Sequence, residues 1–248
     1  MGLLATLALA VGLGGIGQAY DEVEVPDGGT ITGQVKYVGP AQTLAPLKVT
    51  KDPDLCGKEA PSETLLISAN GEVRYAVVFL EGISQGKKID RTKETWLTQE
   101  KCHFGPHVFT MVKGTDLSVK NADPFLHNAN MAVNGIQMFN FGQPKKDQVI
   151  IKRVRKTGLV EVTCDSHPHM EGHFMVFDHP YHAVTGPEGT FTLDQIPPGK
   201  YTVKLWHESW KVKGQDEDGR PIYEQSVVLN QEIEVPTKGM VRVNFELK

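Results

Sequence analysis

The sequence lacks the patterns that would place it in several common classes. No long stretch of the 248 residues shows a convincing apolar period of 3.6, and residues 91–101 are the best candidate for a short helix. It contains no Cys-x-x-Cys-His, Gly-x-Ser-x-Gly or His-Glu-x-x-His motif, so covalent haem and the common hydrolase chemistries have no support. Basic residues form no large cluster and the net charge is -4, which argues against nucleic-acid binding.

Turn-forming residues and short apolar runs are abundant instead. The chain has 25 glycines and 15 prolines, and its β-branched and aromatic residues gather in short segments. This distribution is typical of a turn-rich all-β protein. Strands are predicted over residues 30–38, 73–80, 108–112, 116–120, 149–154, 160–164 and 173–177.

The N-terminal residues resemble a targeting segment rather than part of the fold. The apolar run at residues 3–16 is too short to span a bilayer comfortably, and small residues at 17–19 suit a signal peptidase. We expect residues 1–19 to be a signal peptide, which gives a mature chain without a membrane span in the periplasm or another extracytoplasmic space. The run lacks a preceding Lys or Arg, so an uncleaved anchor stays an alternative.

A strand end followed by soft donor residues carries the most specific chemistry. Residues 160–164 alternate so that Cys164 points inward at the strand end, with His167 three positions later and Met170 three beyond that. A thiolate, an imidazole and a thioether suit copper, and a second histidine completes a type 1 site. His127 is the candidate, because it follows a turn after a predicted strand. One copper ion at these four residues is therefore expected.

Cys164 belongs to the predicted metal-binding loop, which leaves two of the three cysteines to be explained. Export to an oxidising compartment permits disulfides, and an odd number leaves one cysteine over. Cys56 and Cys102 then remain to form a disulfide. Three buried thiols are the alternative.

Residues 100–178 resemble the cupredoxins, with a ligand loop spaced as in amicyanin. The resemblance rests on Asn-x-Asp and His-Asn within residues 121–128, followed by Cys-x-x-His-Pro-x-Met at 164–170. It implies a Greek-key β-sandwich with copper near one end, and it implies that Asn128 braces the ligand loop near the Cys164 sulfur.

A blue-copper carrier of this kind needs a way for electrons to leave. We expect His167 and Pro168 to lie on an exposed loop as the electron exit, with Pro124 and Phe125 in an apolar collar for a partner. The partner would be a redox protein such as a cytochrome or a dehydrogenase.

Two histidines depart from the simple cupredoxin pattern. His169 stands where amicyanin-like loops tend to carry an aromatic residue, and His173 follows nearby. Either is a candidate for a second metal site or for displacing Met170. The alternative is that both are exposed polar residues.

The C-terminal third resembles a carboxypeptidase-regulatory-like module, which is a transthyretin-like β-sandwich. Its features are a turn at Gly189, a Pro-Pro-Gly turn at residues 197–199 and alternating strands after each. The usual opening strand of such a module, Gly-x-Ile-x-Gly-x-Val, occurs at residues 29–35. We therefore expect one sandwich from residues 20–98 and 179–248, with a copper domain of residues 99–178 inserted. Two consecutive units that share strands are the alternative.

Three functions fit these patterns. The first is an exported type 1 copper protein that carries single electrons and is not an enzyme. The second is a copper-binding or scaffolding protein in which the metal is stored or structural. The third is a small copper redox enzyme with a second site at His169 or His173, so the sequence leaves enzyme activity open.

Overall fold

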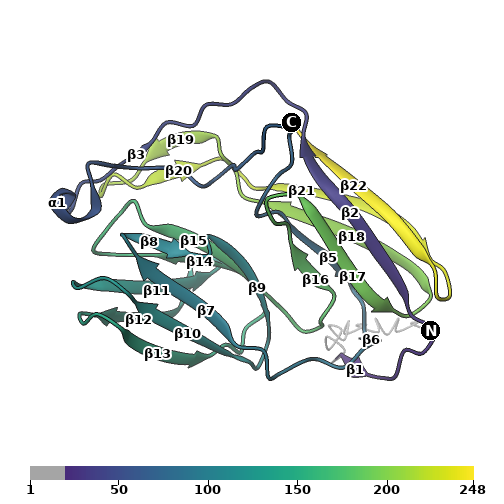
Figure 1. Ribbon diagram of the computed structural model, residues 1–248. Coiled ribbons are helices and arrows are strands. Elements are labelled where there is room, and N and C mark those ends of the chain that lie inside the picture. Colours follow the sequence, from purple (N-terminus) through teal and green to yellow (C-terminus); the bar gives the residue numbers. More distant parts are fainter. Residues whose placement is uncertain (1–19) are drawn as a thin grey trace, which may run out of the picture.

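The computed structural model describes residues 20–248, and the expected signal peptide lies outside this range. Regular structure in the range is almost entirely β-strand, which confirms the predicted all-β class. Figure 1 shows two lobes, a teal lobe from the middle of the chain and a second lobe from the purple N-terminal and green-to-yellow C-terminal segments. No helix in the described part of the chain is long and apolar enough to cross a membrane.

The teal lobe is a sandwich of two sheets. The larger sheet has the order β12-β11-β14-β15-β9, with bounds Ile136–Gln143, His127–Val133, Gly158–Thr163, Glu171–Phe177 and Val108–Val112. The smaller sheet has the order β13-β10-β7-β8, with bounds Gln148–Arg153, Asp116–Asn121, Thr95–Glu100 and His103–Gly105. Inward-facing residues of both sheets form one buried apolar core, as alternation along each strand requires.

The second lobe is also a sandwich, built from both ends of the described chain. One sheet has the order β16-β5-β18-β21, with bounds His182–Val184, Val77–Glu81, Gly199–His207 and Val227–Val235. The other has the order β17-β2-β22, with bounds Thr190–Ile196, Gly29–Tyr37 and Met240–Leu247. β2 pairs in parallel with β22 from Thr30 opposite Met240 to Tyr37 opposite Leu247. A strand from the start of the chain therefore completes the sandwich of its last third.

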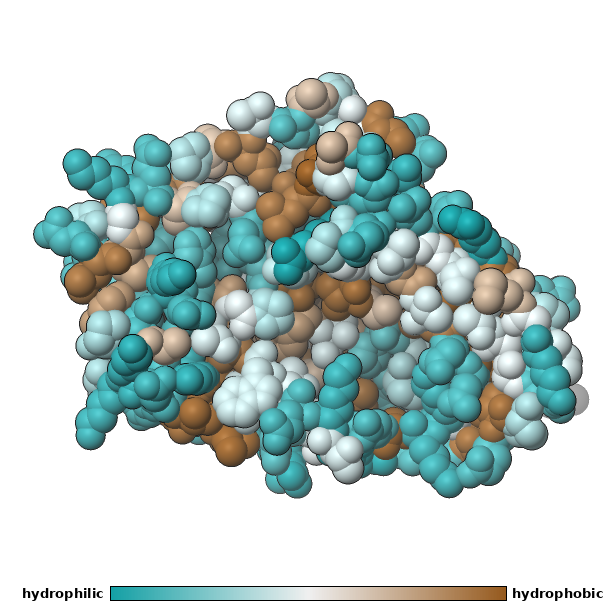
Figure 2. All heavy atoms as spheres, in the orientation of Figure 1, coloured by the Kyte–Doolittle hydropathy of each residue, from teal (hydrophilic) through white to brown (hydrophobic). Residues whose placement is uncertain are grey.

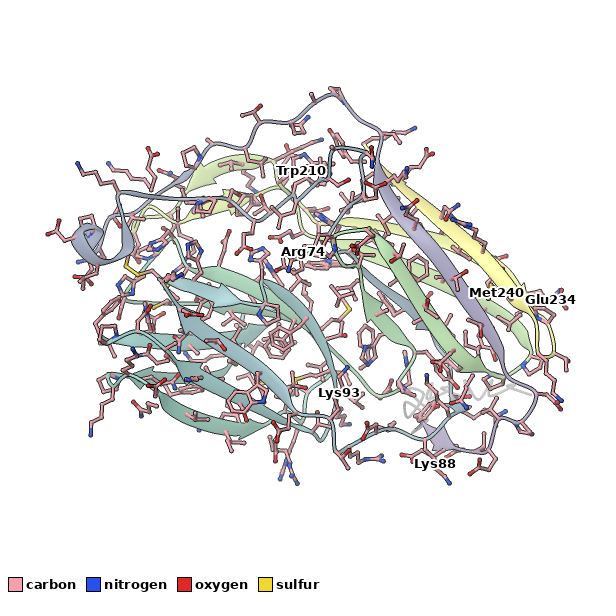
Figure 3. The ribbon with its side chains drawn as sticks, viewed as in Figure 1. Arg74, Lys88, Lys93, Trp210, Glu234 and Met240 are labelled. Carbon is pink, nitrogen blue, oxygen red and sulfur yellow. A yellow bond between two sulfur atoms is a disulfide. The ribbon has the colours of Figure 1, made fainter. Side chains whose placement is uncertain are left out.

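Two excursions from the second lobe reach across the teal lobe (Figure 1). We call them the cover. The first is residues 47–60, with β3 (Leu47–Lys48), α1 (Pro53–Cys56) and β4 (Glu59–Ala60), and the second is the hairpin of β19 (Val212–Gln215) and β20 (Pro221–Tyr223). Trp210, labelled in Figure 3, is buried where the chain leaves β18 toward this hairpin. The remaining strands, β1 (Asp21–Glu22) and β6 (Gln85–Gly86), pair with each other.

The lobes meet through a separate apolar cluster. It joins Val108, Met175 and Phe177 of the teal lobe to Val77 and Trp206 of the second lobe. The Phe177 and Phe79 rings, one from each lobe, have centroids 5.0 Å apart. Burial of aromatic and aliphatic side chains from both sides holds the two sandwiches together.

Several sequence-based expectations can be compared with these elements. The predicted strands are confirmed, most closely at Val108–Val112, except that the one expected over residues 73–80 begins only at Val77. The short helix expected over residues 91–101 is wrong, because β7 occupies most of that stretch and pairs in parallel with β10. The sequence analysis also missed the hairpin of β11 and β12, although Asn134 and Gly135 at its tip both have positive φ, as an Asn-Gly hairpin turn favours.

Candidate metal centre

Three of the predicted ligands meet at one end of the five-stranded sheet. His127 opens β11, while Cys164 directly follows β14 and begins the ligand loop, residues 164–170, which leads into β15. β11 and β14 are antiparallel neighbours, with Asn130 opposite Thr163. The start of one strand therefore lies beside the end of the other, which places His127 next to the ligand loop.

The side chains of His127, Cys164 and His167 face one small space. The two Nδ1 atoms lie 3.0 Å apart, and Sγ of Cys164 lies 3.7 Å from Nδ1 of His167. The three ligand atoms all lie within 4.8 Å of one another, and none of the three residues is exposed to solvent. Met170 is equally buried and belongs to the same core. Two imidazoles, a thiol and a neighbouring thioether match the donor set of type 1 copper.

Each imidazole is oriented by a carboxylate at its other ring nitrogen. Nε2 of His127 lies 2.8 Å from Oδ2 of Asp123, and Nε2 of His167 lies 3.1 Å from Oδ2 of Asp52. When Nε2–H is donated to a carboxylate, the neutral ring directs its Nδ1 lone pair into the shared space. Two such lone pairs 3.0 Å apart repel each other unless a cation lies beside them. The arrangement therefore fits a bound metal ion.

The electrostatic surroundings favour the neutral histidine that a metal requires. Burial lowers the pKa of His127 below its ordinary value, against the opposing hydrogen bond to Asp123. Burial likewise raises the pKa of the Cys164 thiol. A bound cation reverses this second effect, because a coordinated thiol loses its proton.

Asp123 fixes His127 because it is itself tied to the backbone. Its carboxylate accepts hydrogen bonds from the backbone N–H of Lys101 at 2.8 Å and of Cys102 at 3.0 Å. Burial raises the pKa of Asp123, but the hydrogen bonds from Cys102, His127 and Lys101 outweigh it and hold the pKa below its usual range. Asp123 therefore stays ionised and keeps the ring of His127 in place.

Asn128 connects the strand that carries His127 to the ligand loop. Its backbone N–H points at Sγ of Cys164, 3.5 Å away, and its side-chain oxygen accepts hydrogen bonds from the backbone N–H of Asp165 and of Ser166. Its side-chain N–H groups donate to Asn140 and to Asp165, each at 2.9 Å. The position of Asn128 is therefore that of a brace for the ligand loop.

The cover lies directly over the ligand loop. The Arg220 guanidinium donates to the carbonyl oxygens of Cys164, at 3.0 Å, and of Met170, at 3.1 Å. Asp52, which contacts His167, immediately precedes α1, and a disulfide joins Cys56 at the end of α1 to Cys102. Figure 3 shows this disulfide in yellow beside α1. Both excursions of the cover are thus fixed to the metal end of the teal lobe.

This cover corrects two expectations. His167 and Pro168 are buried, so they do not form an exposed electron exit. His169 is 6% exposed and His173 lies half-buried in β15, so neither is the exposed polar residue that one alternative describes. The sequence-based expectation assumed that the loop faced solvent, as the end of an isolated sandwich does, and could not anticipate segments from the other lobe above it.

The turn before β11 is partly exposed and lies beside the histidine pair. Pro124 and Leu126 are exposed, and Phe125 between them is half-buried. The Phe125 ring centroid lies 5.0 Å from that of His127 and 5.9 Å from that of His167. One aromatic side chain of this partly exposed turn thus packs against both imidazoles.

The structure also shows functional positions that the sequence analysis missed. Asp52 and Arg220 lie far from the ligand loop in sequence, and no local pattern links them to it. Asp123 had a signal, because it is the acidic residue of the Asn-x-Asp motif before His127. His107 contacts Glu208 at the boundary between the lobes.

A comparison with protein families finds a similarity in the C-terminal part of the chain. The model of the family "BOS complex subunit NOMO1-like, second beta sandwich domain" matches residues 178–236. No curated protein matches the sequence.

Three solved structures illustrate the similarity to known folds, and each covers between 34% and 40% of this chain. A purple cupredoxin from Nitrosopumilus maritimus is 19% identical, with 34% of this chain and 99% of that chain covered and a TM-score of 0.29. Amicyanin from Paracoccus versutus is 17% identical over 40% of this chain and 96% of that chain, at 0.31. The copper-containing nitrite reductase from Thermus scotoductus SA-01 is 21% identical over 36% of this chain, at 0.31, and only 23% of its own length is covered. Because these TM-scores are low, the evidence for a metal site is the geometry of this chain's own residues.

Proposed function

We propose that this chain binds one copper ion at His127, Cys164, His167 and Met170, and that it carries single electrons outside the cytoplasm. The observation that carries the proposal is the buried space on which two Nδ1 atoms and one thiol converge within 4.8 Å. A copper ion bound there supplies a one-electron couple. The disulfide between Cys56 and Cys102 fits an oxidising compartment.

The residues around the ligands keep the site in one geometry. Asp123 and Asp52 hold the two imidazoles, Asn128 braces the loop, and Arg220 holds both of its ends through carbonyl oxygens. A site that cannot rearrange changes little when the charge of its ion changes, and this lowers the barrier to electron exchange.

Electrons have a short route to the surface through the turn before β11. Phe125 packs against both imidazoles, and Pro124 and Leu126 beside it are exposed. We place the contact with a redox protein, such as a cytochrome or a dehydrogenase, at this turn. The apolar collar of Pro124 and Phe125 would therefore contact the partner, whereas the buried His167 would not.

The optical spectrum of the copper-loaded, oxidised chain tests the ligand set. We expect an intense thiolate-to-copper band, and Cys164→Ser should abolish it because a hydroxyl cannot replace the soft thiolate. Ser166→Ala, in the same loop, is the control and should keep the band. A coloured Cys164→Ser protein, or a wild type that takes only zinc, would show that the assignment is wrong.

Copper retention is a second candidate function, and the burial of the whole ligand loop favours it. A site closed by Asp52 and Arg220 exchanges its ion slowly, as a storage or structural site requires. Voltammetry distinguishes the two. A reversible couple at a fixed potential supports the carrier, whereas colourless Cu(I) without a reversible couple supports retention.

A further inference from the structure

A second cluster of metal-binding side chains lies between the lobes. His107 precedes β9 and His173 lies in β15, both in the teal lobe, whereas Glu208 directly follows β18 of the second lobe. One ligand atom from each residue lies within 4.8 Å of the others. The cluster therefore forms only because the two sandwiches pack against each other.

Its polar atoms are only partly satisfied. Nε2 of His107 lies 2.5 Å from Oε1 of Glu208, while Nδ1 of His173 lies 3.6 Å from Oε2. Among the described residues, neither that Nδ1 nor that Oε2 has a hydrogen-bond partner, although both atoms are buried. Glu208 is 5% exposed, and leaving a carboxylate oxygen unpaired at such a position is costly. A simple ion pair with His107 leaves this second oxygen unexplained.

The backbone holds the two histidines in register. The N–H of His173 donates to the carbonyl oxygen of His107 at 2.8 Å, and β15 and β9 continue the pairing from that point. The Trp206 ring packs at 5.5 Å from that of His173 and limits its rotation. Both rings are thus positioned before any ligand binds.

A cavity of about 400 Å³ adjoins the cluster. His173 and Glu208 line it, together with Glu171, Trp206, Arg220 and Tyr223. The Tyr223 hydroxyl and one Glu171 carboxylate oxygen are also buried without a hydrogen-bond partner in the described part of the chain. The space therefore suits water or a small polar ligand beside the cluster.

We propose that His107, His173 and Glu208 form a second metal site, for a divalent first-row transition ion such as Zn²⁺, with open coordination positions toward this cavity. Two imidazoles and one carboxylate are a three-residue ligand set that leaves room for water or substrate. Because this ligand set contains no thiolate, it favours a different metal ion from the first centre, which contains Cys164. His173 lies three residues beyond Met170, so β15 links the two centres.

Zinc binding to the full mature chain tests this site. Protein already loaded with copper is titrated with Zn²⁺ by calorimetry, and its metal content is measured after desalting. We expect one equivalent of zinc beyond the copper. Glu208→Gln and His173→Gln should each weaken zinc binding by at least about tenfold while the copper colour stays, because each removes one of three ligands.

Matched controls keep the result specific. Glu161→Gln changes another carboxylate that lines the cavity, and His103→Ala changes another histidine of the teal lobe, so both should bind zinc as the wild type does. If Glu208→Gln fails to fold, the half-buried His173 decides through its own variant. The same titration on Cys164→Ser protein reads the second site independently of the first.

Two outcomes would overturn the proposal. The first is a folded wild type that takes no zinc beyond its copper. The second is zinc binding that persists unchanged in both variants. A loss of stability in Glu208→Gln, without zinc binding by the wild type, would assign His107 and Glu208 to a buried ion pair that holds the lobes together.

Discussion

At the scale of single residues, two supports of the candidate metal centre lie near its proposed ligands in sequence and two lie far away: Asp123 and Asn128 flank His127, whereas Asp52 and Arg220 come from distant parts of the chain. His167 is buried on a loop of its own lobe, yet the carboxylate at its Nε2 comes from Asp52, 115 residues earlier. Arg220 reaches the same loop from 50 residues beyond Met170. Short motifs were enough to single out His127, Cys164 and His167, whose ligand atoms the structure brings together. The long-range partners depend on packing between lobes, which no local pattern encodes.

Met170→Leu should keep the blue colour and raise the reduction potential. A thioether is a weak axial donor, and its loss favours Cu(I) over Cu(II). Voltammetry and the optical spectrum of the variant measure both effects. Met131→Leu, a buried control in β11, should leave the potential unchanged. An unchanged potential in Met170→Leu would mean that Met170 is not a ligand.

Asp52→Ala should raise the potential on the order of 20–40 mV, the size expected for a charge largely screened by water. The carboxylate at Nε2 of His167 stabilises the more positive oxidised site, so its removal favours Cu(I). Asp54 is also exposed but lies within α1. Asp54→Ala removes one negative charge as well and is therefore the matched control. Equal shifts in both variants would show a general charge effect instead of support for His167.

At the scale of elements, strands with clear alternation could be predicted and segments set by tertiary contacts could not. β9, β10 and β13 match the expected strands closely. β7 lacks a clear alternating signal because one of its two buried positions is the polar Gln99, while the large apolar Trp96 is exposed. The cover has almost no local signal, since its short strands pair only within each excursion and its place depends on the other lobe.

The disulfide should stabilise both the fold and the cover. It closes a span of 46 residues, so the Cys56→Ser/Cys102→Ser chain should lose roughly 4 kcal/mol of unfolding free energy in the chain-entropy view. Because it also fixes α1 beside His167, a chelator should remove copper faster from this variant. Denaturant unfolding and stopped-flow chelation measure the two effects. Unchanged chelation would mean that α1 keeps its place without the bond.

At the scale of the whole molecule, we propose that the second lobe is one discontinuous domain with the copper lobe inserted into it. β2 pairs with β17 and β22, and β5 pairs with β16 and β18, so each of its sheets needs strands from both sides of the insertion. The turn signal at Gly189 and the opening motif at residues 29–35 indicated that the first and last parts of the chain share a sheet, as the pairing of β2 with β17 and β22 shows, but they did not indicate the path of the cover.

A chain that joins residue 94 to residue 179 through a short linker should fold cooperatively without copper. It keeps both sheets of the second lobe but uncovers Val77 and Trp206, so we expect lower stability than in the full chain. Circular dichroism and thermal unfolding check this. Residues 179–248 alone lack β2 and β5 and should aggregate. Cooperative folding of that fragment would favour two consecutive domains.

The parallel pairing of β2 and β22 has a mechanical consequence. Tension applied at the start of β2 and the end of β22 loads their hydrogen bonds together in shear, instead of opening them one after another as in a peeled hairpin. The teal lobe is formed by the chain between these two strands and lies off the line of force. A force–extension trace pulled from residues 29 and 247 should therefore show one strong rupture first. Unfolding of the teal lobe before that rupture would contradict this mechanical role of the β2–β22 pair.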